Sequence, residues 1–579
     1  MRELKKYLKD YRKECILGPL FKLLETGFEL LVPLVVAAMI DRGIGAKDTA
    51  LIIRYCLLLV CLGFAGFCAA IIAQYFAAKA STGFAAKIRA ALFTHLHCFS
   101  AAQCDRIGVS RMTTLMTSDT QQVQTGLNLT LRLLLRSPFV VFGAVGMAFT
   151  VDTRAARIFV ITVPLLFIVV FAIMLIGIRC FAGVQTALSG VLGTVRENLT
   201  GTRVIRAFCA EKREQNTFRT RNNTLLQKQL FSGRISALLS PLTYVLINLA
   251  VVVLIWQGAL RVQMGALSVG AVVALYNYMS QILIELIKMA NLVINVTKSV
   301  ACANRIAQIL QEDAPEYAVL SPGENELPAV FNLEKDAVTF SNVQLRYHLT
   351  AEPALNDISF SVAPGETIGI IGPTGSGKSS LIQLIPRFYD ATQGVISIFG
   401  QPVRNLSTLL LRTQIGLVPQ KALLFSGSIR TNLLFGNPQA DDDELWEAAR
   451  LAQCEDVIKS KGGLDAPVEQ GGKNFSGGQR QRLSIARALV RKPRILILED
   501  STSALDFATE AALRRALAHL SWNPTVFIVS QRIASIRHAD KILVLQDGNL
   551  LATASHTVLY QTCPEYRAIC DSQQKEAAL

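Results

Sequence analysis

A chain of 579 residues is too long for a single hydrophobic core, so two or more domains are expected. Hydrophobic residues make up 51% of the chain and charged residues only 17%, a balance far from the soluble average and typical of a membrane protein. The net charge of +15 does not indicate a nucleic-acid partner, because Lys and Arg gather before the first apolar segment and within residues 196–234, as the positive-inside rule describes for cytoplasmic segments.

Six apolar stretches are each long enough to cross a bilayer as a helix, which needs about 20 residues. We therefore expect a multi-pass protein of the cell (cytoplasmic) membrane, in contact with lipids, with both termini in the cytoplasm. Two long polar segments, 79–132 and 179–234, are expected to extend the helices into the cytosol and end in turns that press on another domain. The six stretches are 16–40, 51–77, 133–151, 158–178, 235–256 and 267–294.

Two carboxylates lie in the first apolar stretch. Glu25 and Glu29 are one helical turn apart and so share a face. They could line a cavity for cationic or amphipathic substrates, or they could pair with Arg132 or Arg136 of a neighbouring segment. Both interpretations are open at this point.

The sixth stretch also carries polar residues at helical spacing. Gln281, Glu285 and Lys288 follow one another by four and three residues. The spacing favours an ion pair between Glu285 and Lys288 within the helix over contact with a substrate.

The pattern changes after residue 313. Residues 314–329 contain three prolines and a glycine among acidic residues, which is typical of a linker. Beyond the linker, short strands alternate with helices, as in an α/β domain. The predicted organisation is a helical transmembrane domain at 1–313, a linker at 314–329 and an α/β domain at 330–579, which the motifs below predict to bind a nucleotide.

A glycine-rich segment follows the strand-like run 368–371. It matches the phosphate-binding pattern G-x-x-x-x-G-K-[ST] at every fixed position and precedes a helix-like run that begins at Ser380. Glycines let the backbone approach a phosphate, and the amides of the new helix point at the anion. Lys378 is predicted to reach the β- and γ-phosphates of ATP, and Ser379 to bind Mg²⁺. The segment reads Gly372, Pro373, Thr374, Gly375, Ser376, Gly377, Lys378 and Ser379.

Further motifs follow in a fixed order. Gln420 ends the strand-like run 415–419, and a loop at 474–480 holds Ser476, Gly477, Gly478 and Gln479 ahead of a helix-like run. The apolar strand 495–498 then ends in two acids, and Asp506 follows closely. In this order the motifs, together with the six apolar stretches, resemble the ATP-binding cassette (ABC) exporters over nearly the whole chain.

The resemblance implies roles for several of these residues. Tyr347 matches the aromatic residue that stacks on adenine; the alternative is a strand residue packed in a β core. Gln420 matches the glutamine that contacts the metal and the attacking water. The signature loop, Ser476 to Gln479, caps the γ-phosphate of a nucleotide held by a second cassette, so a chain with one cassette must pair with another half-transporter.

Three positions depart from the family pattern. Glu499 stands where the family has the aspartate that holds Mg²⁺, and Asp500 stands where it has the glutamate that polarises water. Gln531 replaces the usual histidine and can neither carry a positive charge nor shuttle a proton. A carboxylate one methylene short is too far away for a general base that must approach to about 3 Å. These changes indicate a site that binds ATP and hydrolyses it slowly, if at all.

The signature loop is nearly intact, which fits one half of a heterodimeric multidrug-type exporter of small hydrophobic or amphipathic compounds. In that interpretation the partner subunit holds the competent site. Three alternatives remain open: a homodimeric exporter with slow hydrolysis, a lipid flippase, and an ATP-gated channel or regulatory subunit.

Overall fold

The computed structural model describes residues 3–313, 331–347, 352–501 and 505–578. The chain divides into two compact units, one of Met1–His95 with Ser110–Glu312 and one of Leu96–Val109 with Asp313–Leu579. The predicted fold class, six apolar helices followed by an α/β domain, is confirmed. The predicted linker at 314–329 lies outside the described residues.

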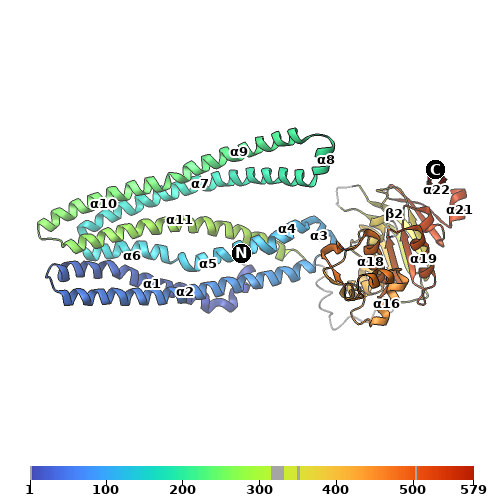
Figure 1. Ribbon diagram of the computed structural model, residues 1–579, viewed down its shortest axis with the longest axis horizontal. Helices are drawn as coiled ribbons and strands as arrows, with labels where there is room; N and C mark the ends of the chain where they lie inside the picture. Colours follow the sequence, from blue (N-terminus) through green and yellow to red (C-terminus); the bar gives the residue numbers. More distant parts are fainter. Residues whose placement is uncertain (1–2, 314–330, 348–351, 502–504, 579) are drawn as a thin grey trace. The chain divides into compact units, whose positions relative to one another are not determined.

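The first unit is built from long helices (Figure 1). Its six apolar spans are 41 to 53 residues long, more than twice what a bilayer needs, so each extends well beyond the membrane. The spans are Leu4–Ile44, Thr49–His97, Val109–Val151, Thr153–Thr200, Glu211–Gln263 and Val269–Gln311. The elements are η1 (Glu3–Tyr11), α1 (Arg12–Ala38), η2 (Met39–Ile44), α2 (Thr49–His97), α4 (Val109–Thr114), η3 (Leu115–Asp119), α5 (Thr120–Leu133), α6 (Arg136–Val151), α7 (Thr153–Thr200), α8 (Thr202–Ala207), α9 (Glu211–Ala237), α10 (Leu239–Gln263) and α11 (Val269–Gln311).

Small residues let two of these helices approach closely. On α2, Ala73 and Ala77 are buried one turn apart. Gly18 of α1 faces them, and a Cβ at this glycine would lie 3.5 Å from the backbone nitrogen of Ala77. Since lipid tails are as apolar as the side chains, such close backbone packing holds membrane helices together.

The second unit contains a six-stranded sheet in the order β12-β11-β3-β10-β9-β6, a four-stranded antiparallel sheet in the order β2-β1-β4-β5, and the pair β7-β8. Strands β11, β3, β10, β9 and β6 are parallel, and β12 is antiparallel. The strands are β1 (Val338–Leu345), β2 (Leu355–Val362), β3 (Thr367–Ile371), β4 (Gln393–Ile398), β5 (Gln401–Pro402), β6 (Ile415–Val418), β7 (Gly427–Ser428), β8 (Pro467–Val468), β9 (Ile495–Glu499), β10 (Thr525–Val529), β11 (Lys541–Gln546) and β12 (Asn549–Ala554).

The helices of the second unit complete this α/β fold. They are α3 (Ala101–Ile107), α13 (Lys378–Leu384), η4 (Val403–Asn405), α14 (Thr408–Thr413), α15 (Ile429–Leu433), α16 (Asp442–Leu451), α17 (Glu455–Ser460), η5 (Gln470–Gly472), α18 (Gly477–Leu489), α19 (Phe507–Ala518), α20 (Ile533–Ile536), α21 (His556–Thr562) and α22 (Pro564–Ala578).

The parallel arrangement decides where the site lies. Strand β9 is buried along its whole length, as expected for a strand covered on both faces. Parallel strands end at one edge of the sheet, and ligands bind outside that edge in α/β proteins. The ends of β3, β6, β9 and β10 therefore bring the phosphate loop together with Gln420, Glu499, Asp500 and Gln531.

Candidate nucleotide-binding site

The phosphate loop joins β3 to α13. Gly375 and Gly377 have φ of 87° and 96°, in the left-handed region that favours glycine. A Cβ at Gly377 would lie 2.8 Å from the carbonyl oxygen of Ala354, so the close backbone approach requires glycine here. Helix α13 begins directly afterwards, at Lys378.

The loop positions its lysine tightly. Lys378 Nζ donates to the carbonyl oxygens of Gly372 and Pro373, both at 2.8 Å. Burial lowers the pKa of the Lys378 ammonium, while the charge of Asp500 acts in the opposite direction. In the same loop, Ser376 Oγ is buried and has no hydrogen-bond partner among the described residues. A glycine cradle, a partly desolvated ammonium and an orphaned hydroxyl fit a bound phosphate chain.

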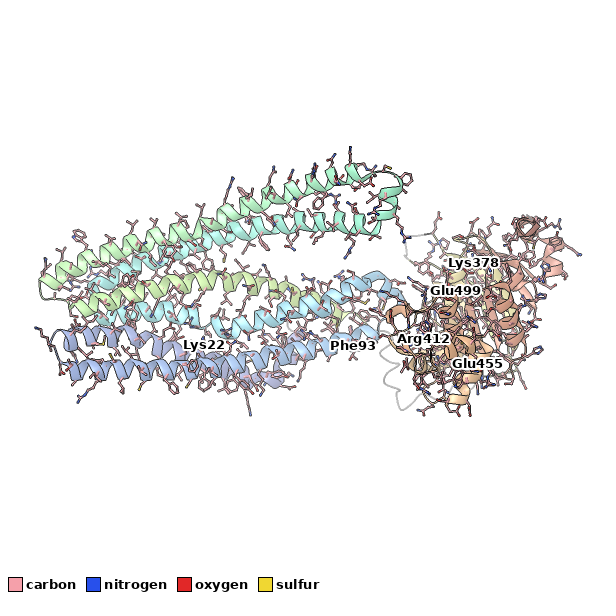
Figure 2. The ribbon with its side chains drawn as sticks, in the orientation of Figure 1. Lys22, Phe93, Lys378, Arg412, Glu455 and Glu499 are labelled. Carbon is pink, nitrogen blue, oxygen red and sulfur yellow. The ribbon has the colours of Figure 1, made fainter. Side chains whose placement is uncertain are left out.

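These residues line a pocket of about 380 Å³. In Figure 2, Lys378 and Glu499 lie in the same part of the second unit. Most of the predicted site residues line the pocket: Tyr347, Thr374, Gly375, Gly377, Lys378, Ser379, Ser380, Gln420, Glu499, Asp500 and Gln531. The predicted residues outside its lining are Gly372, Pro373, Ser376, Ser476, Gly477, Gly478, Gln479 and Asp506. Ala354, Val529 and Ser530 also line it, and no sequence motif marks them.

Two adjacent acids stand at the end of β9. Glu499 is its last residue and is buried, whereas Asp500 has left the strand with φ of 43°. Aspartate is among the residues that tolerate this left-handed conformation. Gln420 Nε2 donates to Asp500 Oδ2 at 3.3 Å, which links the ends of β6 and β9.

The donor set suits Mg²⁺ better than a transition metal. No group of three or more His, Cys, Asp or Glu side chains that could hold a metal occurs in the described parts of the chain. Mg²⁺ is commonly held by one or two protein oxygens together with phosphate oxygens and water. Ser379, Gln420 and Glu499 supply such oxygens around one pocket.

Tyr347 lines the same pocket and contacts a second aromatic ring, that of Tyr389. Tyr347 lies beyond the end of β1 and is 46% exposed, so it is not packed in a β core. Its hydroxyl donates to Ser380 Oγ at 2.9 Å, and its ring meets Tyr389 edge-on with 5.0 Å between centroids. The Tyr389 hydroxyl donates to Asp105 of α3, and burial raises the pKa of Tyr389. Sequence patterns missed Tyr389, because no local motif marks it.

The signature loop has its own local order. Ser476 caps α18: its Oγ accepts from the backbone nitrogen of Gln479 at 3.3 Å, and Gln479 Oε1 accepts from the nitrogen of Ser476 at 2.9 Å. This reciprocal capping box fixes the start of the helix. Ser476 and Gly477 are exposed, so their polar groups are accessible to a ligand from outside the chain.

Asp506 performs a similar structural role for α19. Its carboxylate accepts from the backbone nitrogen of Thr509 at 2.8 Å and from the Thr509 hydroxyl at 3.0 Å. These hydrogen bonds lower the pKa of Asp506.

The polar residues of the first apolar stretch are paired. Arg136 Nη2 donates to Glu29 Oε2 at 2.8 Å, so of the two arginines considered it is Arg136 that pairs with Glu29. Glu25 pairs with Lys22 at 2.6 Å, a partner in its own helix that the sequence analysis did not consider. Figure 2 labels Lys22 on α1.

The sixth span joins the same network. Lys288 Nζ lies 2.8 Å from Glu285 Oε1, which confirms the predicted intrahelical pair. Glu285 also accepts from Arg136 Nη1 at 2.7 Å and from Ser137 Oγ at 2.9 Å, contacts the sequence did not indicate. One buried arginine thus ties α1, α6 and α11 together.

Comparison with known proteins agrees with this architecture. The protein-family model for the ABC transporter transmembrane region matches residues 15–286. The protein-family model named ABC transporter matches residues 355–503. An uncharacterized ABC transporter ATP-binding protein of Mycobacterium tuberculosis is 34% identical over 100% of this chain and 98% of its own length. The chain therefore belongs to the ABC transporters, with the six-helix membrane region and ATP-binding domain of an exporter.

Other similar proteins carry more specific names. A putative multidrug export ATP-binding/permease protein of Staphylococcus aureus is 30% identical over 96% of this chain and 96% of its own length. An ATP-dependent lipid A-core flippase of Desulfotalea psychrophila is 30% identical over 84% of each chain. A bacterial Atm1-family ABC exporter, solved with ATP bound, has the same fold, with a TM-score of 0.80 and 24% identity over 97% of this chain and 98% of its own.

Proposed function

We propose that this chain is one subunit of a heterodimeric exporter that moves hydrophobic or amphipathic compounds across the cytoplasmic membrane by alternating access. The observation that carries the proposal is that Asp500 and Gln531 line the same pocket as Lys378. At these two positions the family pattern has the glutamate and the histidine that act on the attacking water. The chain's own site therefore binds ATP and turns it over slowly.

In this proposal, the residues of the pocket bind nucleotide and metal. Lys378 and the loop amides hold the phosphates, and Tyr347 presents its ring to the adenine. Ser379, Gln420 and Glu499 hold Mg²⁺, which neutralises charge on the transferring phosphoryl group when bound. Gln531 supplies a hydrogen bond to phosphate without the charge of a histidine.

The signature loop acts on the partner's nucleotide. Ser476 and the exposed amides at the start of α18 are held in place by the capping box and are free to face a second cassette. Binding of ATP then favours the closed pair of cassettes, because nucleotide contacts both of them only in that state. Hydrolysis at the partner's site resets the transporter.

The proposed orientation puts both termini and the nucleotide-binding domain, residues 330–579, in the cytoplasm, after a linker at 314–329. The basic stretches at the N-terminus and at 196–234 support it.

The proposed difference between the slow ATP site of this chain and the competent site of its partner can be tested in the purified complex of the two subunits. Ser476→Ala is expected to lower ATP hydrolysis about tenfold or more, because it removes a group aimed at the competent site. Lys378→Ala is expected to leave most of the hydrolysis in place. Equal losses from the two changes contradict the proposal.

Lipid flipping is a second candidate, because the relative named as a lipid A-core flippase is 30% identical. The two candidates differ in substrate, and movement of a labelled lipid between leaflets of a proteoliposome separates them. Drug-stimulated ATPase activity of the chain alone, abolished by Asp500→Asn, would instead indicate a homodimeric exporter. Single-channel currents without uphill efflux would indicate an ATP-gated channel.

A further inference from the structure

A second pocket, of about 310 Å³, lies within the membrane unit. It is formed by α7, α9, α10 and α11 and does not involve the nucleotide-binding unit. At one end its lining is mainly apolar, with Met174 and Ala290 buried in a small hydrophobic cluster and the polar Asn291 beside them. At the other end it is lined by Ser232 and Lys298. The pocket is therefore amphipathic along its length.

The polarity changes along the direction of the membrane normal. Ala290 and Lys298 are eight residues apart on α11, a rise of about 12 Å. The apolar end falls inside the sixth apolar stretch, which ends at residue 294, and Lys298 lies beyond that end. In the orientation proposed above, the polar end lies at the cytoplasmic surface of the membrane. A lipid of the cytoplasmic leaflet has the same polarity at the same depth.

The polar end of the pocket carries hydrogen-bond donors that have no acceptor among the described residues. Lys298 Nζ lies 4.4 Å from the centroid of the Phe181 ring, and within the described residues it forms no ion pair. Ser232 and Ser236 are one turn apart on α9, and neither hydroxyl has a hydrogen-bond partner in the described part of the chain. An ammonium and two hydroxyl donors beside an apolar cavity match a phosphate attached to an acyl chain.

We propose that this pocket binds one anionic phospholipid of the cytoplasmic leaflet. An acyl chain lies against Met174 and Ala290, and the phosphate accepts from Lys298, Ser232 and Ser236. A soluble phosphate would leave the apolar end empty, and a neutral lipid would leave the ammonium without an anion. The inference rests on the orientation proposed above, and it concerns binding alone and does not depend on the proposed export activity.

Two substitutions test the two ends of the pocket. A Cβ at Gly177 meets no atom within 4 Å, so Gly177→Leu fills the pocket without a clash in the helix. Gly183→Leu is its matched control, because Gly183 is equally open on α7 and lies outside the pocket lining. Lys298→Gln removes the charge, and Lys298→Arg keeps it. Arg234→Gln removes an exposed charge on α9 outside the lining and is the second control.

The experiment uses the full chain in nanodiscs without ATP. Phosphatidylglycerol with a photoreactive group on its acyl chain is compared with phosphatidylcholine carrying the same group, and labelled peptides are identified by mass spectrometry. Phosphatidylglycerol is expected to label the pocket segments of α7 and α11 about fivefold more than phosphatidylcholine, the effect of one lysine at an anionic surface. Gly177→Leu and Lys298→Gln are expected to lower this labelling by a similar factor, and the other three variants to retain it.

Equal labelling by the two lipids overturns the proposal. So does labelling that is unchanged in both Gly177→Leu and Lys298→Gln. Since neither readout uses ATP or transport, failure here leaves the export function standing, and failure of the export function leaves this site standing.

Discussion

The side-chain amide of Gln420 donates to the carboxylate of Asp500, with 3.3 Å between Nε2 and Oδ2. The contact joins two residues that the chain separates by 80 positions but that the parallel sheet brings to one edge. It holds the Asp500 carboxylate beside Gln420, in the pocket that Lys378 and Gln531 also line.

Placing the glutamate and histidine of the family pattern in this site is expected to raise its rate of ATP hydrolysis. Asp500→Glu combined with Gln531→His should raise ATP hydrolysis at this site about tenfold or more, because general-base catalysis contributes about 10²–10⁴ when the base reaches its proton. The measurement is steady-state ATPase activity of the complex in which the partner's own phosphate-loop lysine has been changed to alanine.

The control for this experiment adds Lys378→Ala to the restored chain. That change removes a donor from the phosphate loop and should abolish the gain. A restored chain that hydrolyses ATP no faster than the parent would show that the two positions do not limit turnover.

The residues at the edge of the sheet could be predicted from the sequence, but some of the contacts around them could not. The phosphate loop and the residues that follow β6, β9 and β10 were predictable. Each comes directly after an apolar run, and parallel strands end at the same edge of a sheet. Tyr389 and Asp105 were not, because they meet across 284 positions of the chain. Residues 96–109, which the sequence predicts to lie in a cytoplasmic segment of the transmembrane domain 1–313, belong by their contacts to the second unit.

Ion pairs in the membrane unit were likewise predictable within one helix but not between helices. The pair of Glu285 with Lys288 follows from spacing on one helix, and it was predicted. The contact of Glu285 with Arg136 depends on how α6 packs against α11, and spacing within a helix carries no information about that.

Tyr347 is expected to contribute nucleotide affinity through its ring. Tyr347→Ala should raise the dissociation constant of ATP about fivefold or more, since stacking of a base on an aromatic ring contributes about 1–3 kcal/mol. Titration with a fluorescent ATP analogue measures the change. Tyr347→Phe is the control, because it keeps the ring and loses only the hydroxyl that donates to Ser380. Equal weakening by both changes would assign the effect to the hydroxyl.

His538 makes the stability of the chain depend on pH. Partial desolvation of the exposed ring, together with the nearby positive charges of Arg514 and Arg537, lowers the pKa of His538 below its usual value. The neutral ring is favoured in the folded state, where His538 Nε2 accepts from Arg537 Nε at 3.1 Å. The stabilisation is present above the unfolded pKa of about 6.5 and is lost as pH falls through the folded pKa.

Thermal unfolding of the full chain in detergent, measured between pH 7.5 and 5, tests this. The melting temperature of the parent should fall as the pH is lowered, and His538→Gln should reduce that fall. His519→Gln is the matched control, because His519 is exposed like His538 but lies in another segment, at the end of α19. If both variants follow the parent, another group accounts for the pH dependence.

Arg136 should be the most sensitive charge in the membrane unit. It is 8% exposed, bonds to Glu29 and to the 3%-exposed Glu285, and has a buried Nε without a partner in the described residues. Removing one member of a buried ion pair typically costs about 3–5 kcal/mol, since it leaves the other charge uncompensated. Arg136→Met and Glu285→Met should each lower the free energy of unfolding by about 3 kcal/mol.

The double variant separates pairing from packing. Arg136→Met with Glu285→Met removes both charges and should cost less than the sum of the single losses, with a coupling energy of about 1 kcal/mol or more. Unfolding by sodium dodecyl sulfate in mixed micelles gives the free energies. Lys288→Met is the control, because the Lys288 side chain is 44% exposed and its loss should cost less than about 1 kcal/mol. Strictly additive losses would mean that Arg136 and Glu285 stabilise the helices independently, and that the ion pair does not couple α6 to α11.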